Sequence, residues 1–245
     1  MFAFISLCFG VWSIHHLSLK SFFILLAKIN WSKIFFAFSL WIAVNLFLEA
    51  ISYYYDADNY IYQLDWSKFL PLLAIALLLL PIQTSFEELL LRGYLMQGIA
   101  NISAYRWIPL VSTSIIFGLV HGMNPEVQAF GAGVMMTYYI GIGLFLGIIT
   151  LMDDSLELAL GIHAATNIYG ALMLSFEGSV LQTPAIFRLK TVNVDFMIPA
   201  FLALSLLFLY IFAKKYKWKD WHKIYGPVNF VYFKAAAEQA DDRIA

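Results

Sequence analysis

Charge is scarce in this sequence, and its scarcity excludes the most common class of protein. Charged residues make up 13% of the 245-residue chain, whereas a soluble domain normally carries about 25%. Hydrophobic residues make up 62%, and several long apolar runs hold no charge at all. The composition therefore excludes an ordinary soluble domain. It predicts an all-α fold, a polytopic transmembrane helix bundle.

Cysteine and basic patches are scarce as well. Cys8 is the single cysteine, so the chain has no internal disulfide, no cysteine metal cluster and no C-x-x-C redox pair. No basic patch stands apart from the membrane flanks, so we expect no nucleic acid among the partners. The first apolar stretch has no basic segment before it and no small-residue cleavage site after it, so a cleavable secretory signal is not indicated.

What the chain does have is a series of apolar runs. A membrane helix needs roughly 20 apolar residues, and the sequence predicts about seven such helices. They cover residues 1–19, 34–54, 69–98 with Pro81 inside, 107–121, 127–151, 156–174 and 196–213. The first is short for a span, as it would be in a chain whose natural N-terminus lies further upstream.

These segments divide the chain into four parts. N-terminal membrane helices and an acidic external loop cover residues 1–66, and a core with the polar motifs covers residues 67–175. A loop and the last membrane helix cover residues 176–213, and a basic, polar tail covers residues 214–245. No internal repeat is visible.

Basic residues in short loops predict the orientation, because they accumulate on the cytoplasmic side. They fall on one side of the membrane and are Lys20, Lys28, Lys33, Arg92, Arg106, Lys214, Lys215, Lys217, Lys219 and Lys223. The acidic loop with Asp56, Asp58 and Asp65 falls on the other. We therefore expect a cytoplasmic C-terminus, and the compact chain is typical of a bacterial inner-membrane protein.

Ionisable residues within the spans carry most of the functional information, because each costs roughly 2.5–3.5 kcal/mol on insertion scales. They are Glu49, Glu87, Glu88, Arg92, His121 and His163. Glu49 lies near the outer end of its helix, where its side chain is expected to reach the surface. The other five belong to three short motifs.

The first motif is the run EELLLR. Glu88 and Arg92 are four residues apart, so they share a helix face and can pair. Glu87 points about 100° away, so it is left facing something else. A solvated interfacial turn is the plainer interpretation, but the apolar sequence on both sides argues against it.

The other two motifs are FGLVH and HAATN. Phe117 and His121 share a helix face, and so do His163 and Asn167. Taken alone, His121 is more often a satisfied residue at a helix end. The pair His163 and Asn167 is more often a contact between helices.

Together the three motifs favour a site. Glu87 and His121 are equidistant from residue 104, inside the turn signal ANISAYRW, so in an antiparallel hairpin they face each other. A following helix with Gly131, Gly133, Gly141, Gly143 and Gly147 can then pack closely. The depth of the two histidines in the membrane is the one mismatch. Counted along each helix from its cytoplasmic end, His121 and His163 lie at depths that differ by roughly 10 Å. Strongly tilted helices or a protruding hairpin would bring them together.

A carboxylate, two histidines and an amide can hydrolyse a peptide bond. A glutamate with a histidine can deprotonate water, and a histidine with an asparagine can stabilise an oxyanion. No G-x-S-x-G motif is present, so water is the expected nucleophile. Glu87, His121 and His163 would also suit a zinc ion, although H-E-x-x-H is absent. The residues leave the metal and metal-free versions open.

The ordered set E-E-x-x-x-R, F-x-x-x-H and H-x-x-x-N resembles the CPBP family, which comprises the CAAX prenyl endopeptidases and their bacterial relatives. The resemblance runs from about residue 85 to 170. It implies an intramembrane endopeptidase, with Glu87 and His121 activating water and His163 and Asn167 stabilising the oxyanion. Glu88, Arg92 and Phe117 would support them. It does not settle glutamate-only or metal-dependent catalysis, and the prenyl substrate is not carried over.

Three functional hypotheses follow. The first is an intramembrane protease acting on a peptide or membrane protein. The second is a non-catalytic membrane adaptor or bacteriocin-immunity protein with the same fold, although binding alone does not need a buried carboxylate base. The third is an ion-coupled transporter with Glu87 and His121 as a relay, but the interruption at Pro81 has no counterpart in a second repeat. The lipid bilayer is the one other expected partner, and the oligomeric state is not indicated.

Overall fold

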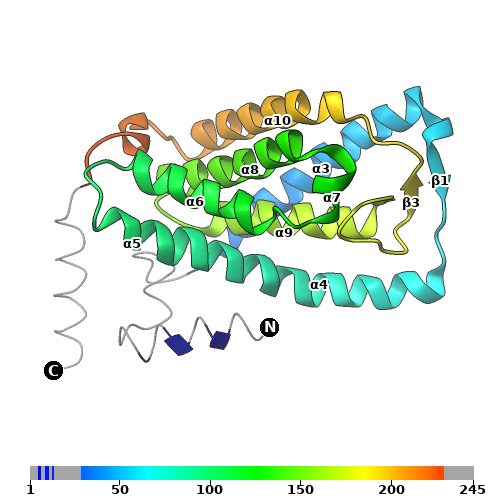
Figure 1. Ribbon diagram of the computed structural model, residues 1–245, viewed down its shortest axis with the longest axis horizontal. Coiled ribbons are helices and arrows are strands. Elements are labelled where there is room, and N and C mark those ends of the chain that lie inside the picture. Colours follow the sequence, from blue (N-terminus) through cyan, green and yellow to red (C-terminus); the bar gives the residue numbers. More distant parts are fainter. Residues whose placement is uncertain (1–4, 7–8, 11–12, 14–28, 229–245) are drawn as a thin grey trace.

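Helices dominate the structure, a computed structural model that describes residues 5, 6, 9, 10, 13 and 29–228. The predicted all-α bundle is therefore confirmed. The predicted first span at residues 1–19 and the tail beyond residue 228 lie outside this part, apart from the five single positions. The long helices run side by side, and α9 packs against α3, α4 and α8 (Figure 1).

The helices and strands have these bounds. The helices are α3 (Trp31–Tyr55), α4 (Trp66–Glu88), α5 (Met96–Ala100), α6 (Trp107–Val120), α7 (Pro125–Phe130), α8 (Ala132–Asp153), α9 (Glu157–Leu172) and α10 (Val194–Lys215). The short turns are η1 (Ala57–Asn59), η2 (Leu89–Leu95, a π-helical segment) and η3 (Trp221–Ile224). The strands are β1 (Tyr60–Tyr62), β2 (Leu174–Phe176) and β3 (Phe187–Leu189).

Within the part of the chain that the structure describes, four helices are long and apolar enough to cross a membrane. They are α3, α8, α10 and the helix formed by α4, η2 and α5 together, which runs for 35 residues from Trp66 to Ala100. The helices α6 and α9 are shorter, at 14 and 16 residues. Pro81 lies inside α4 without ending it. The phase of this long helix changes instead at η2, directly after Glu88, and such π-helical turns are frequent at functional sites.

The predicted span at residues 127–151 is wrong in one respect, because Gly131 divides it. The backbone of Gly131 has φ 90° and ψ 138°, which ends α7 and starts α8 in a new direction. Glycine reaches positive φ without the steric cost that a side chain brings. In the sequence this residue looked like one more small residue on a packing face.

A small sheet at one end of the bundle was not predicted either. β3 lies between β1, which pairs with it antiparallel, and β2, which pairs with it parallel. The sheet joins the loop after α3, the end of α9 and the loop before α10 (Figure 1). Strands of three residues are too short to show a period in the sequence.

Glu49 is partly buried near the end of α3. Its carboxylate accepts a hydrogen bond from the Tyr60 hydroxyl and one from the Tyr169 hydroxyl at 3.3 Å. Burial and the adjacent Glu49 raise the pKa of Tyr60 to about 12, so this phenol remains a donor at physiological pH. The two hydrogen bonds tie α3 to β1 and α9.

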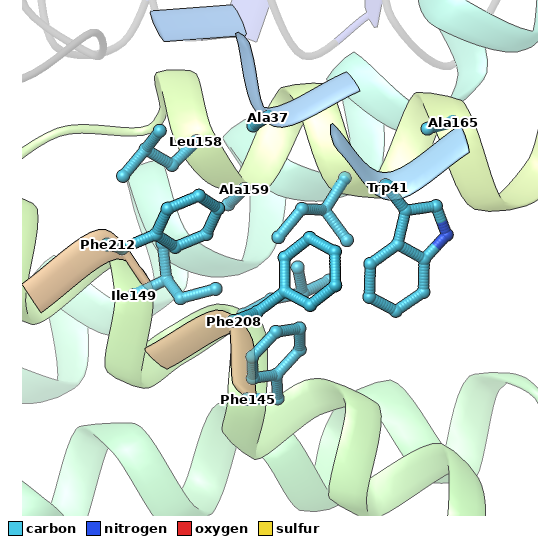
Figure 2. Close-up of a cluster of buried hydrophobic side chains, with 11 residues drawn as sticks. Ala37, Trp41, Phe145, Ile149, Leu158, Ala159, Ala165, Phe208 and Phe212 are labelled. Carbon is cyan, nitrogen blue, oxygen red and sulfur yellow. The ribbon is translucent and has the colours of Figure 1, made fainter. Parts of the chain in front are cut away.

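Aromatic side chains fill the core between α3, α8, α9 and α10 (Figure 2). Trp41 packs edge-on against Phe208 with ring centroids 4.8 Å apart, and it also contacts Phe145. Because lipid is as apolar as these side chains, the core holds the helices together through close packing more than through exclusion of water.

Glycines allow two of these helix pairs to approach closely. A Cβ on Gly143 of α8 would stand 2.9 Å from the Ser114 Cα of α6, and one on Gly161 of α9 would stand 2.4 Å from the Ile34 carbonyl oxygen of α3. The close packing predicted for α8 is thus confirmed at Gly143, Gly147 and Gly141. Gly133 has no atom within 4 Å of its Cβ position and plays no such part.

Most of the basic residues that the structure describes lie at one end of the bundle, whereas Lys68, Arg188 and Lys190 lie near the small sheet at the other end. Lys33 pairs with Asp153 at 2.8 Å, and Lys223 pairs with Asp154. Arg106 donates to the Pro227 carbonyl at 3.3 Å near the same end. Arg92, by contrast, is 1% exposed and lies within the bundle. Arg92 therefore does not lie in a loop and gives no information on the orientation in the membrane.

We predict that Gly161→Ala loosens the contact of α3 with α9. The added methyl group would meet a backbone carbonyl, so α3 must shift, and we expect a loss of about 1–3 kcal/mol in the free energy of unfolding. Gly170→Ala on the same helix is the matched control, because nothing lies within 4 Å of its Cβ position. Unfolding in detergent measures both, and equal stability of the two variants would contradict the packing described here.

Candidate active site

Glu87 and His121 face each other across the hairpin of α4–α5 and α6, as their equal distance from residue 104 predicted. Glu87 Oε2 lies 3.9 Å from Nε2 of His121. The same oxygen lies 3.7 Å from Nε2 of His163 on α9. The depth mismatch between the two histidines is therefore resolved, because the hairpin extends further along the bundle than the start of α9 does. One carboxylate oxygen and two imidazole nitrogens meet at a common point.

The two histidines are held in a definite tautomer by their other ring nitrogens. Nδ1 of His121 lies 2.7 Å from the Phe117 carbonyl oxygen, which can only accept, so Nδ1 carries the proton and donates. Nδ1 of His163 lies 2.7 Å from Glu88 Oε1 and donates to that carboxylate. In the neutral imidazole each Nε2 then presents a lone pair to Glu87. Three electron-rich atoms facing one point favour a proton donor or a cation there.

Glu88 and Arg92 form the buried pair that their spacing predicted. Nη1 of Arg92 donates to Glu88 Oε1 at 2.8 Å, and both side chains are fully buried. Nη2 of Arg92 donates to the Gly143 carbonyl of α8 at 3.0 Å. The contact of Glu88 with His163, 75 residues away, was not predicted. Glu88 therefore supports the site through His163 as well as through Arg92.

Glu87 is the accessible member of the two adjacent acids. Its side chain is 19% exposed, whereas that of Glu88 is 0% exposed. Gln83, one turn earlier on α4, donates to Glu87 Oε1 at 3.2 Å. The two oxygens of Glu87 are thus divided, one taken by Gln83 and the other directed at the histidines. Gln83 was missed in the sequence, where an amide near the start of an acidic motif carries no distinctive signal.

Phe117 is the packing centre beneath these groups. Its ring stacks on His121 at 4.4 Å between centroids, lies edge-on to His163 at 5.8 Å, and has the Arg92 guanidinium 4.9 Å above it. The motif F-x-x-x-H therefore describes a stacked pair that fixes the ring plane of His121.

Tyr139 of α8 covers the opposite side of His121 and was also missed. The two ring centroids are 5.0 Å apart, and the Tyr139 hydroxyl accepts a hydrogen bond from the Asn124 amide at 3.2 Å. Only the close approach of α8 to α6 brings it here. In the sequence, only the position of Tyr139 in a glycine-rich helix could have indicated this contact.

Asn167 follows His163 by one turn on the same face of α9. It is half-buried, and among residues 29–228 no hydrogen bond engages its side-chain amide. An amide of this kind beside a reactive centre can donate to a developing oxyanion. The structure thus brings Glu87, His121 and His163 together. Asn167 lies one helical turn beyond His163 on α9.

The donor set suits zinc in type. Two imidazoles anchored through Nδ1 and one carboxylate are the ligands and the supporting hydrogen bonds that zinc sites use. Ligand atoms about 2.0–2.2 Å from zinc stand roughly 3.4 Å apart at tetrahedral angles, whereas the observed separations are 3.7 and 3.9 Å. Within the described residues no three such side chains are gathered tightly enough to form a metal cluster as they stand.

One protein family matches the part of the chain that carries this site. Residues 66–169 match the family described as Type II CAAX prenyl endopeptidase Rce1-like. This membrane core belongs to the Rce1-like family. All three motifs, from Glu87 to Asn167, fall inside the matched segment. Together with the apolar helices, the match makes the chain an integral membrane protein with a core from a protease family.

One curated relative extends the match. The uncharacterized protein YyaK of Bacillus subtilis (strain 168) is 34% identical over 174 residues, which cover 68% of this chain and 56% of the relative. The chain thus spans little more than half the length of that relative. No solved structure matches the chain.

We predict that Glu88 and Arg92 stabilise the fold only as a pair. Glu88→Leu or Arg92→Leu alone leaves a buried charge without its partner, and we expect a loss of about 3–5 kcal/mol. The double variant buries no charge, so it should lose clearly less than the sum of the two. Denaturant unfolding in detergent measures the three variants, with Lys68→Ala as a surface control that should change little. Simple additivity of the two single losses would contradict the coupling.

Proposed function

We propose that the protein is an intramembrane endopeptidase that hydrolyses a peptide bond in a membrane-associated peptide or protein. The observation that supports this most directly is the convergence of Glu87 Oε2 with Nε2 of His121 and of His163. Three ionisable groups surround one point, beside a buried network that holds them in place. Membership of the core in the Rce1-like family supports the same reaction class.

Water is the proposed nucleophile. A water at this point donates its protons to Glu87 Oε2 and to the lone pair on His121 Nε2, which leaves its oxygen lone pairs free to attack. As the oxygen bonds to the peptide carbonyl carbon, Glu87 takes one proton as general base. When the carbon–nitrogen bond breaks, Glu87 returns that proton to the leaving amine. The stacked Phe117 ring and the tilted Tyr139 ring keep His121 aligned throughout.

His163 and Asn167 are the proposed hydrogen-bond donors to the oxyanion. For His163 this role requires a particular protonation state. Because Nδ1 of His163 already donates to Glu88, the ring can donate from Nε2 only as an imidazolium. The charges then balance: Glu87 and Glu88 contribute −2, and Arg92 and His163 contribute +2. A site without net charge is the less costly one to place in a membrane. Asn167 adds its neutral amide to the same oxyanion.

Zinc is the second version of this mechanism that the donor set supports. Glu87 Oε2 with Nε2 of His121 and His163 would hold the ion, which would supply Lewis-acid polarisation and a bound water of lowered pKa. The two versions differ in His163, because a zinc ligand must be neutral whereas an oxyanion donor must be protonated. Both use the same anchoring by Glu88.

The proposed location is a bacterial inner membrane with the C-terminus in the cytoplasm. The basic end formed by Lys33, Arg106 and Lys223 supports this orientation under the positive-inside rule. The partners are then the lipid bilayer and a peptide or membrane-protein substrate.

We predict that Glu87→Gln abolishes cleavage and leaves the fold intact. An amide of the same size cannot accept the proton, so we expect a rate loss of about 10²–10⁴-fold. Comparative proteomics of membrane-derived peptides, with the intact protein and with Glu87→Gln, identifies the substrate, and turnover of that substrate gives the rate. Glu49→Gln is the control, a second carboxylate within a span but away from the site.

Two outcomes would oppose this assignment. Full turnover of an identified substrate by Glu87→Gln and His121→Ala would remove both from catalysis. A protective or partner-binding effect that survives Glu87→Gln, with unchanged peptides, would favour the adaptor function.

Metal analysis separates the two mechanisms. If the ion takes part, the purified protein should contain about one zinc per chain, and His163→Ala should lower that content as well as activity. If His163 is the imidazolium donor, the active protein should be free of stoichiometric metal and resist chelators. Elemental analysis of the active protein before and after chelation, with an activity assay on each, decides between them.

A further inference from the structure

A polar cavity lies at the basic end of the bundle, away from the three motifs. It has a volume of about 410 Å³ and lies between the ends of α8 and α10 and the segment that follows α10. Its wall includes Asp153 and Asp154 at the end of α8. The segment after α10 adds Lys217, Trp218, Lys219 and Asp220. The proposed reaction uses none of these residues.

The backbone around this cavity is unusual. Within the described residues, Asp154 with φ 51° and Lys217 with φ 56° are the only non-glycine residues with positive φ, and both line the cavity. Lys217 stands at the position after a helix end that glycine normally occupies, because the Trp218 amide reaches back to the Ala213 carbonyl at 3.0 Å. A lysine in this strained conformation is a pointer to function, since strain of this kind clusters at binding sites.

Four lysines and three aspartates line the cavity, so it carries one positive charge in excess. Lys33 pairs with Asp153, which also accepts from the Trp218 indole at 3.4 Å, and Lys223 pairs with Asp154. Among residues 29–228, Lys217 and Lys219 have no carboxylate within ion-pair distance. These two ammonium groups, beside the carboxylate of Asp220, are thus available to an anionic ligand.

The helix α10, which ends just before the cavity-lining segment, carries exposed apolar side chains. Leu202, Leu206 and Tyr210 are 54%, 67% and 62% exposed on this helix, which is apolar enough to cross a membrane. Trp221 lies beyond the helix and is 40% exposed, as is common for aromatic residues at the membrane surface. A ligand that fills the cavity with an anionic group can therefore lay acyl chains on α10.

We propose that this cavity is a binding site for an anionic phospholipid, with the phosphate of its headgroup between Lys217 and Lys219. Phosphate oxygens accept charge-assisted hydrogen bonds from lysine, and α10 offers the apolar surface for the chains. The site lies apart from Glu87 and its partners, so the proposal does not depend on the proposed protease activity.

The test is binding of short-chain phosphatidylglycerol to the full-length protein in detergent, followed by tryptophan fluorescence, since Trp218 lines the cavity. We expect saturable binding that weakens at least tenfold in Lys217→Ala/Lys219→Ala. The matched control is Lys68→Ala/Lys190→Ala, which removes the same charge from exposed sites nearer the small sheet and should bind as the intact protein does. Phosphatidylcholine and glycerophosphoglycerol are titrated in parallel, and both should bind more weakly.

Lys217→Gly separates binding from folding. Glycine relieves the positive φ, so this variant should unfold at the same or a higher temperature and still bind the lipid more weakly. Unchanged binding in the double lysine variant, or an equal loss in the control variant, would overturn the site. Equal binding of glycerophosphoglycerol would overturn its assignment to a lipid in favour of a soluble phosphate ester.

Discussion

One buried oxygen, Oε1 of Glu88, organises the polar centre of this bundle. It accepts from Nη1 of Arg92 on its own helix and from Nδ1 of His163 on α9. A lone carboxylate or guanidinium at this depth would be strongly unfavourable, whereas the pair offsets the two charges. The pair also fixes His163, and Arg92 reaches α8 through the Gly143 carbonyl. The functional division between two adjacent glutamates follows from this arrangement, because Glu88 is used inside the protein and Glu87 is left to face the site.

The order imposed by Glu88 determines what the histidines can do. Each imidazole uses Nδ1 inside the protein, one on Glu88 and the other on the Phe117 carbonyl, so each offers Nε2 to the site. A catalytic site needs such anchoring, since displacing a catalytic group by about 1 Å weakens catalysis severely. The choice between an imidazolium and a zinc ligand at His163 is then a question of what occupies the shared point, and not of a different fold.

Local spacing predicted much of this site from the sequence. Four-residue spacing gave the pair Glu88 and Arg92, and the symmetry of a hairpin about residue 104 placed Glu87 opposite His121. Contacts between helices distant in the chain were not accessible in the same way. Glu88 with His163 and His121 with Tyr139 depend on how closely α9 and α8 approach, which glycines such as Gly143 allow but do not specify. The break at Gly131 and the three-residue strands were not predicted for another reason. Neither of them changes the spacing of apolar residues along the chain.

The hairpin that carries Glu87 and His121 is held at both of its ends. Toward the site, the buried charges and Phe117 connect it to α8 and α9. At its turn, the segment after η3 binds it through the backbone, where the Arg106 amide donates to the Gly226 carbonyl at 2.9 Å and the Val228 amide donates to the Ala104 carbonyl at 3.0 Å. That segment follows directly on the residues from Tyr216 to Lys223 that line the cavity. The cavity wall and the segment that holds the hairpin turn are therefore parts of one continuous stretch of chain, and this stretch connects the basic end of the bundle to the two helices that carry Glu87 and His121.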